Sequence, residues 1–168
     1  SSTLRAKELA VKRLKQGLPV YDFGIGEAKG KLKDSIKAAG IKAFENENTG
    51  YVPSAGIPEL RKAILKWLNA EENYKETNVF VSVGAKQVIF MYILATCDPG
   101  DTVLLDHAPW VSYSPMIEAC AASPVCVSPS SWTENNLKIS PLDLKKAIKE
   151  NPITKVLIIN SPCNPTGQ

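Results

Sequence analysis

The sequence has few of the residues that metal centres and redox sites require. It contains one histidine, His107, and four cysteines, Cys97, Cys120, Cys126 and Cys163. No two cysteines form a Cys-x-x-Cys pair, and a single histidine cannot complete a zinc-binding set with them. We therefore expect small buried thiols in a reducing, cytoplasmic setting.

Long apolar runs and a strong charge excess are also missing. No apolar stretch approaches the roughly 18 residues that a membrane span needs, and neither a leader peptide nor an Asn-x-Ser/Thr glycosylation site is recognisable. Lys and Arg number 20 against 17 Asp and Glu, and the net charge of +3 is too small to indicate nucleic acid or a membrane as a partner. The 168 residues, 44% hydrophobic and 22% charged, are typical of a soluble globular protein with a core.

The apolar periodicity changes along the chain. Before about residue 75 it predicts helices over residues 4–14 and 33–44 and from Pro58 onward, with a loop at 45–56. Beyond that point it predicts strands at 78–83, 102–105, 124–127 and 155–160, and helices at 85–96, 111–122 and from the Ser140-Pro141 cap onward. This order predicts an α/β fold, a mostly parallel sheet covered on both faces. The helix at 85–96 is apolar almost all round, so we expect it to be buried.

The segment from Ser82 to Gln87 lies where a predicted strand meets a helix. Gly84 permits a tight turn, and the amides of Ala85 and Lys86 are first-turn donors without partners in the helix. Such amides and the helix dipole together form a cradle for a phosphate or another anion. The alternative is a tight turn whose amides bind water. The spacing is not that of a Walker loop.

Two further candidates follow other predicted strands. Trp110 comes after the strand at 102–105, and Asn164 follows the last strand in an Asn-Pro-Thr-Gly turn. Because ligands bind at the carboxyl ends of strands in open α/β sheets, we expect both side chains to lie near Gly84. An indole there stacks on a flat heterocycle, or simply covers the core. His107, the single histidine, is interpreted as structural rather than catalytic.

Other chemistry is weakly supported. Tyr51 lies on a glycine- and proline-rich loop, where an aromatic marks an interface or is half-buried. Gly24-Ile25-Gly26 lacks the third glycine of a dinucleotide fingerprint, because position 29 is Lys29. We recognise no Ser/His/Asp set and no paired carboxylates. The anion cradle, the ring and the amide together predict a pocket for a phosphorylated, flat, polar heterocycle.

Six motifs, taken in order, resemble those of the fold-type-I, pyridoxal-phosphate-dependent aminotransferases of class I/II, nearest to the bacterial aspartate, aromatic and prephenate branch. They are YDFGIGE (21–27), GYVPSAGIPELR (50–61), VGAKQ (83–87), DPGD (98–101), WVSY (110–113) and NSPCNPTG (160–167). The resemblance covers essentially the whole chain. It implies an N-terminal portion of such an enzyme, which exchanges an amino group between an amino acid, of the aspartate or aromatic class, and a 2-oxo acid.

The resemblance also implies roles for residues. The backbone of Gly84, Ala85 and Lys86 would hold the cofactor phosphate, Trp110 would stack on the pyridine ring, and Asn164 would bind its phenolic oxygen. Two residues nearer the N-terminus would complete the site. Tyr51 would reach the phosphate of the neighbouring subunit in a homodimer, and Gly26 would offer its backbone to the substrate carboxylate.

The chain departs from the family pattern in three places. The family usually continues Gly-x-Gly-Glu with Pro-Asp-Phe, whereas Ala28-Lys29-Gly30 stands here, and it often has tyrosine where this chain has Ala108. The family's catalytic lysine, and its residues for the pyridine nitrogen, the phenolic oxygen and the substrate carboxylate, fall after Gln168. We therefore expect no catalytic residue in this segment, and a chain that alone neither forms the continuous sheet nor completes transamination.

The resemblance predicts the domains and leaves two other functions open. It implies a helical arm with part of the small domain over residues 1–30, and an incomplete cofactor-binding large domain, a three-layer αβα arrangement, over 31–168. A lyase or synthase of the same fold would use the same turn and phosphate loop. An aminotransferase-like effector domain of a transcription regulator would follow a DNA-binding module, and only one short helix precedes Gly17.

Overall fold

The structure is a computed structural model that describes residues 2–21, 23, 26, 30–47, 49–130 and 139–167. The chain divides into two units, Ser1–Tyr51 and Val52–Gln168. The domain boundary expected near residue 30 stays a prediction. Residues 28 and 29, where the chain departs from the family pattern, lie outside the described residues.

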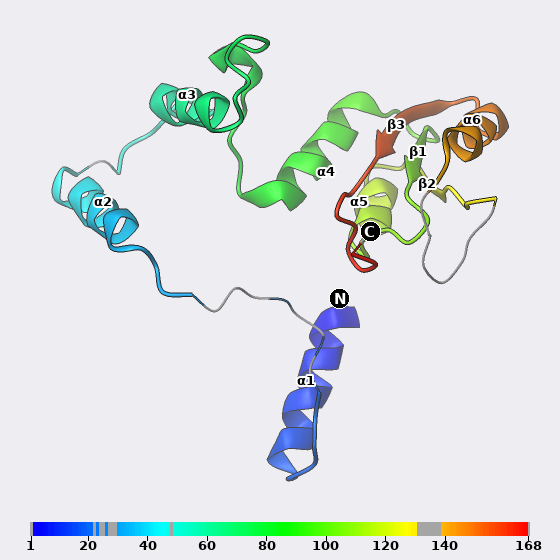
Figure 1. The fold of residues 1–168 in the computed structure, drawn as a ribbon, viewed down its shortest axis with the longest axis horizontal. Coiled ribbons are helices and arrows are strands. Elements are labelled where there is room, and N and C mark those ends of the chain that lie inside the picture. The colour runs from blue at the N-terminus through cyan, green and yellow to red at the C-terminus, as the bar shows by residue number, and fades with distance from the viewer. Residues whose placement is uncertain are drawn as a thin grey trace. The chain divides into compact units, whose positions relative to one another are not determined.

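The first unit contains two helices, α1 (Ser2–Lys15) and α2 (Asp34–Glu45), close to the helices predicted there (Figure 1). Gly17 ends the segment that carries α1, with a φ of 71°, and its amide donates to the Leu14 carbonyl at 3.0 Å. That left-handed conformation favours glycine, as the sequence predicted. None of the side chains described in this unit is buried.

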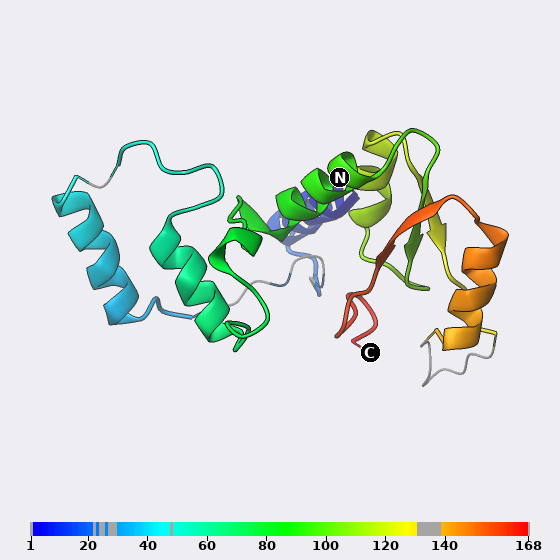
Figure 2. The same ribbon diagram turned by 90° about the horizontal axis from the view of Figure 1, so that it is seen from above.

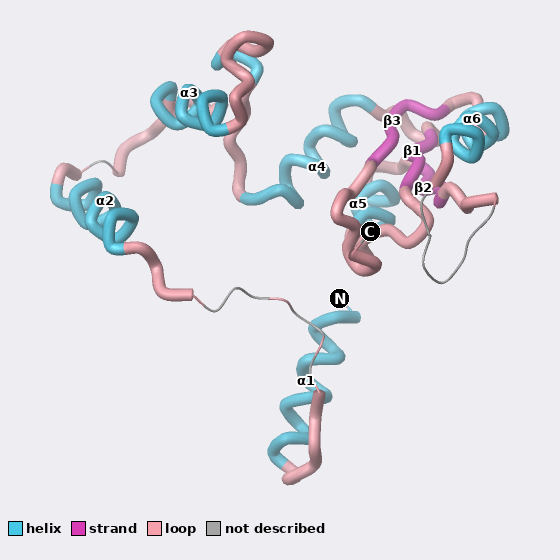
Figure 3. The backbone as a smooth tube through the Cα atoms, in the orientation of Figure 1, coloured by secondary structure: helices cyan, strands magenta, loops and turns pink. Residues whose placement is uncertain are grey.

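The second unit alternates helices and strands, and Figure 3 distinguishes the two. Its elements are α3 (Pro58–Trp67), η1 (Glu76–Asn78), α4 (Gly84–Thr96), β1 (Thr102–Leu105), α5 (Tyr113–Ala119), β2 (Ser123–Cys126), α6 (Pro141–Glu150) and β3 (Thr154–Ile158). In the described part of the chain, no helix combines the length and apolarity that a membrane crossing needs.

The three strands form one parallel sheet in the order β2-β1-β3. Leu105 of β1 is paired with Cys126 of β2 and with Ile158 of β3. The three strands therefore end at the same edge of the sheet, and the loops that follow β1 and β3 begin side by side. These loops carry Trp110 and Asn164 respectively.

The central strand contributes to two cores, one on each face of the sheet. Val103 and Leu105 pack in a cluster with Ile93 of α4 and Ile117 of α5, whereas Leu104 packs with Ala147 of α6. Successive side chains of a strand point to opposite faces, so a run of apolar residues is buried on both sides. Figure 2 shows α6 on one side of the sheet and α4 and α5 on the other. The predicted α/β class and three-layer arrangement are confirmed.

The strand predicted over residues 78–83 is wrong. The structure has the 3-10 turn η1 at its start and then extended backbone, with φ −104° and ψ 126° at Val79. In this segment the Val81 amide donates to the Ala55 carbonyl at 3.0 Å. A strand needs a row of backbone partners. No described strand lies beside these residues to supply one.

The expectation that the 85–96 helix is buried is also wrong for the chain as it stands. Ile93 is its one buried residue, whereas Met91, Tyr92 and Leu94 are 53%, 58% and 59% exposed. The helix packs one stripe against α5 and β1, and the described residues supply no second layer over the remaining apolar surface. The apolar composition of α4 is typical of a helix that is packed on every side, and the described residues pack against only one side of it.

The α6 N-terminus matches the predicted cap. The Ser140 hydroxyl accepts from the Asp143 amide at 3.1 Å, and Asp143 Oδ2 accepts from the Ser140 amide at 2.8 Å, which closes a capping box. Asp143 Oδ1 also accepts from the Ser130 amide at 2.9 Å. The Ser140 hydroxyl in turn donates to Asp143 Oδ2 at 2.6 Å. This bond first, and then the bonds from the Ser140 amide and from Ser130, hold the pKa of Asp143 well below its usual range.

Because the pKa of Asp143 is lowered in the folded protein, we expect stability to be lost in acid. Because the native pKa lies below the ordinary value of about 3.9, the stabilisation is complete above that value and falls as the pH drops below it. We expect the urea midpoint of unfolding to fall from pH 5 to pH 2, and Asp143→Asn to lower the midpoint at pH 7 and flatten this dependence. The exposed Glu118→Gln is the control. An equally steep acid dependence in Asp143→Asn would contradict the assignment.

Candidate functional site

The first turn of α4 presents unpaired backbone donors. Its N-cap, Val83, supplies no side-chain hydrogen bond to the helix. The Val83 amide donates to Gln87 Oε1 at 3.2 Å and the Gly84 amide to the Ser82 carbonyl at 2.9 Å. In the described part of the chain, the amides of Ala85 and Lys86 have no acceptor. Free amides at the positive end of a helix favour an anion.

Gly84 sets the direction in which the chain enters this turn. Its φ is +80°, a left-handed conformation that favours glycine, and a Cβ added there would meet no atom within 4 Å. The glycine is therefore required by the backbone conformation and leaves the approach to the amides open.

Lys86 connects this turn to the loop after β1. Its Nζ atom lies 4.9 Å from the centroid of the Trp110 ring, within cation–π distance. Trp110 is half-buried and makes an edge-to-face contact with Tyr113, with centroids 5.4 Å apart and planes at 83°. The first turn of α4, which carries the free amides, is therefore joined to the Trp110 ring by a cation–π contact.

Asn164 lies in the loop after β3, which contacts the loop after β1. The Cys163 thiol donates to the Ala108 carbonyl at a sulfur–oxygen distance of 3.5 Å. The backbone amide of Asn164 donates to Asn160 Oδ1 at 3.0 Å, and the side-chain carboxamide of Asn164 is exposed. The turn that carries Asn164 is thus joined to the loop that carries Trp110.

Comparison with known proteins identifies the family. The model of the family described as "Aminotransferase class I and II" matches residues 19–168. The chain therefore belongs to the class I and II aminotransferases. It is 42% identical over 98% of its length to a probable aspartate/prephenate aminotransferase of Aquifex aeolicus. It is 37% identical over 99% of its length to the aspartate aminotransferase of Geobacillus stearothermophilus.

Solved aminotransferases have the same fold. The aspartate aminotransferase of Rhizobium meliloti superposes with a TM-score of 0.87 at 32% identity, covering 98% of this chain and 41% of that one. That of Thermus thermophilus with maleate gives 0.86 at 33% identity, covering 98% and 43%. The chain covers 40% of the Aquifex protein and 42% of the Geobacillus one, so it spans about two fifths of the relatives it matches.

The geometry fits the cofactor of this aminotransferase family. Class I and II aminotransferases use pyridoxal phosphate, which combines an anionic group with a flat heteroaromatic ring. The unpaired amides of Ala85 and Lys86 suit the anion, and the indole of Trp110 offers a face for the ring. The exposed amide of Asn164 can donate or accept a hydrogen bond.

Two aminotransferase site residues predicted from the resemblance belong to the first unit. Gly26 and Tyr51 are both exposed, and a Cβ added at Gly26 would meet nothing within 4 Å. Their roles stay predictions. His107, interpreted as structural, lies half-buried in the loop after β1, where its amide donates to Asp106 Oδ1 at 2.7 Å.

The sequence predicts no separate role for Tyr113 and a buried position for all four cysteines. Cys120 and Cys163 are buried as expected, whereas Cys97 is half-buried and Cys126 is exposed on the last residue of an edge strand. Burial raises the pKa of Tyr113, and the nearby Cys163 thiol raises it further. Trp110 and Tyr113 are three residues apart, a spacing from which their contact could have been predicted.

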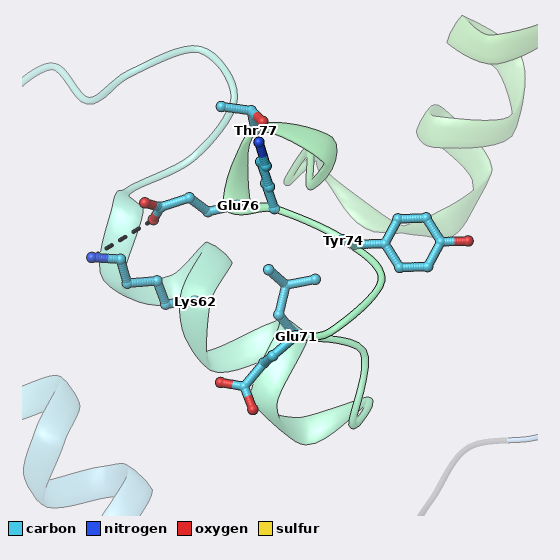
Figure 4. A pocket seen from close by; sticks show the side chains of 7 residues that line it. Lys62, Glu71, Tyr74, Glu76 and Thr77 are labelled. Carbon is cyan, nitrogen blue, oxygen red and sulfur yellow. Dashed lines mark ion pairs between the residues drawn. The ribbon is translucent and has the colours of Figure 1, made fainter.

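A hollow of about 430 Å³ lies beside α3 and η1. Lys62 Nζ and Glu76 Oε2 are 3.8 Å apart there, and the Arg61 guanidinium donates to the Glu76 carbonyl, from Nε at 2.9 Å. Figure 4 shows the Tyr74 ring and the Glu71 carboxylate pointing away from this ion pair. The charged groups do not converge on one point. Among the described residues, no group of three or more His, Cys, Asp or Glu side chains is placed to hold a metal ion.

Proposed function

We propose that this chain is the N-terminal portion of a pyridoxal-phosphate-dependent aminotransferase that transfers an amino group between an amino acid of the aspartate or aromatic class and a 2-oxo acid. The observation that carries the proposal is the 4.9 Å contact of Lys86 Nζ with the Trp110 ring, which links the first turn of α4, where the unpaired amides lie, to an aromatic side chain. The similar proteins named as aspartate and aspartate/prephenate aminotransferases support this substrate class.

Each residue of the site has a proposed task. The backbone of Gly84, Ala85 and Lys86 holds the cofactor phosphate, because free amides at a helix N-terminus bind anions without reorganisation. Trp110 orients the pyridine ring by stacking, and Asn164 holds its phenolic oxygen by a hydrogen bond. Bound pyridoxal phosphate supplies the electron sink through which the amino group is exchanged.

Partners and setting complete the proposal. Gly26 presents its backbone to the substrate carboxylate, and Tyr51 reaches the phosphate held by a neighbouring subunit, which makes a homodimer part of the site. The small net charge and the four free cysteines are compatible with a reducing cytoplasm.

Further polypeptide completes the sheet in this proposal, and the chain alone is inactive. The exposed apolar residues of α4, the unformed strand after η1 and the coverage of about two fifths of the relatives support it. The lysine that bonds to the cofactor is expected in that further polypeptide, so none of the lysines named here is given that task.

Direct binding of pyridoxal phosphate tests the proposal. We expect weak but saturable binding in equilibrium dialysis, and Trp110→Ala to raise the Kd about 5- to 150-fold, because stacking on an aromatic side chain contributes about 1–3 kcal/mol. Trp67→Ala is the matched control, since Trp67 is 81% exposed on α3. It should leave the Kd within about twofold.

Two results would contradict the proposal. An absence of saturable binding, or an equal loss in both tryptophan variants, would remove the cofactor site. A stoichiometric adduct on one lysine after borohydride reduction would show that the chain carries its own cofactor-bonding lysine, against the expectation that the chain alone is inactive.

A further inference from the structure

One side chain joins the two loops that carry Trp110 and Asn164. Cys163 is 7% exposed, and its thiol donates to the carbonyl of Ala108, which lies 55 residues earlier in the chain. Ala108 follows β1, whereas Cys163 follows β3, and the two strands are paired neighbours. The bond therefore fixes the spacing of two loops that the sheet itself only brings near each other.

The main chain of Cys163 also shapes the turn that holds Asn164. The Cys163 carbonyl accepts from the Gly167 amide at 2.6 Å, and the next residue, Asn164, donates its amide to Asn160 Oδ1 at 3.0 Å. A movement of Cys163 therefore moves the base of the Asn164 turn. The thiol is the part of this turn that reaches the other loop.

The loop of Trp110 is supported at the same place. Tyr113 is buried, donates its amide to the Trp110 carbonyl at 3.0 Å and meets the indole edge-to-face at 5.4 Å. Cys163 thus bonds to the loop that carries Trp110 and directly precedes Asn164 in the chain.

We propose that Cys163 is a positioning residue of the cofactor site, whose thiol fastens the Asn164 turn to the Trp110 loop. The inference rests on the proposed function. A flat heterocycle stacked on Trp110 then meets the Asn164 amide at a fixed separation, so the two side chains act together on one ligand. Without the hydrogen bond from Cys163, the loops that carry Trp110 and Asn164 still form. The two side chains then bind the ligand nearly independently of each other.

The test is a double-mutant cycle in the purified protein, with pyridoxal phosphate as the probe and equilibrium dialysis as the readout. We expect Cys163→Ala to raise the Kd about 3- to 10-fold, because a thiol is a weak donor. Cys163→Ser keeps a donor and should recover most of this loss. Asn164→Ala should raise the Kd for pyridoxal phosphate about 10-fold in the unaltered protein, and about threefold or less in the Cys163→Ala background.

Controls separate positioning from folding. Cys126→Ala removes an exposed thiol and should leave the Kd unchanged. Unfolding curves establish that each variant is folded, and Cys163→Val, which lacks the donor but fills the space, replaces Cys163→Ala in the cycle if the alanine variant does not fold.

The outcomes distinguish the two proposals. If the unaltered protein binds and Trp110→Ala weakens binding, but Cys163→Ala leaves the Kd and the Asn164 effect unchanged, the positioning role is overturned and the cofactor site stands. If the unaltered protein shows no saturable binding, both are overturned.

Discussion

Gly56→Ala is expected to lower the free energy of unfolding of the second unit by about 2–4 kcal/mol. Gly56 has a φ of +100°, and an added Cβ would lie 2.6 Å from Cγ2 and 2.8 Å from Cβ of Val81. The Cβ of Val81 cannot swing away by a rotamer change, so the backbone must move. The left-handed conformation alone contributes about 1–2 kcal/mol of this cost.

The chain supplies a matched control for this prediction. Gly100 has a φ of +90° in the same unit, but an added Cβ would meet nothing within 4 Å. Gly100→Ala therefore carries the backbone strain without the collision, and should cost about 1–2 kcal/mol. Urea unfolding followed by circular dichroism measures both variants. Equal losses would show that the contact with Val81 does not restrain the turn.

Leu104→Ala is expected to cost about 2–5 kcal/mol in the same measurement. Leu104 is fully buried in the central strand β1, where it packs with Val127 and Ala147 on the α6 side of the sheet. Truncation removes buried apolar area and leaves a cavity that a strand paired on both sides cannot close. With an unchanged m-value, the loss appears as a lower urea midpoint.

Leu142→Ala is the control for the core, because Leu142 lies on α6 and is 76% exposed. It should change the free energy of unfolding by no more than about 0.5 kcal/mol. An equally small loss of free energy of unfolding in both leucine variants would mean that the side of the sheet facing α6 contributes little to stability.

The elements predicted best are those whose signals are local. The Ser140-Pro141 start of α6, the Pro58 start of α3 and the strand at 102–105 lie where the sequence placed them. A cap, a first-turn proline and a short apolar run act within a few residues. The strand predicted at 78–83 failed because pairing depends on a neighbour, and no described strand lies beside that segment.

The candidate site also combines features with a local signal in the sequence and features that depend on contacts between distant residues. The helix N-terminus at Gly84 was predictable from one glycine before an apolar helix. The proximity of Trp110 was predicted from the rule that loops after parallel strands gather at one edge, but the strand expected before Gly84 is not formed, and the contact is made by the Lys86 side chain. The hydrogen bond from Cys163 to Ala108 was not predictable, because it spans 55 residues and depends on the register of β1 with β3.

The sequence by itself determined where most helices and the three strands β1, β2 and β3 begin, to within about two residues, and which residue types carry anion, ring and amide chemistry, because these depend on neighbours within a turn or two of the chain. The tertiary structure alone decided which faces are covered, that Lys86 lies on the Trp110 ring, and that a buried thiol joins two loops. Such contacts depend on sheet register and on packing between distant segments, and no local pattern of residues encodes them.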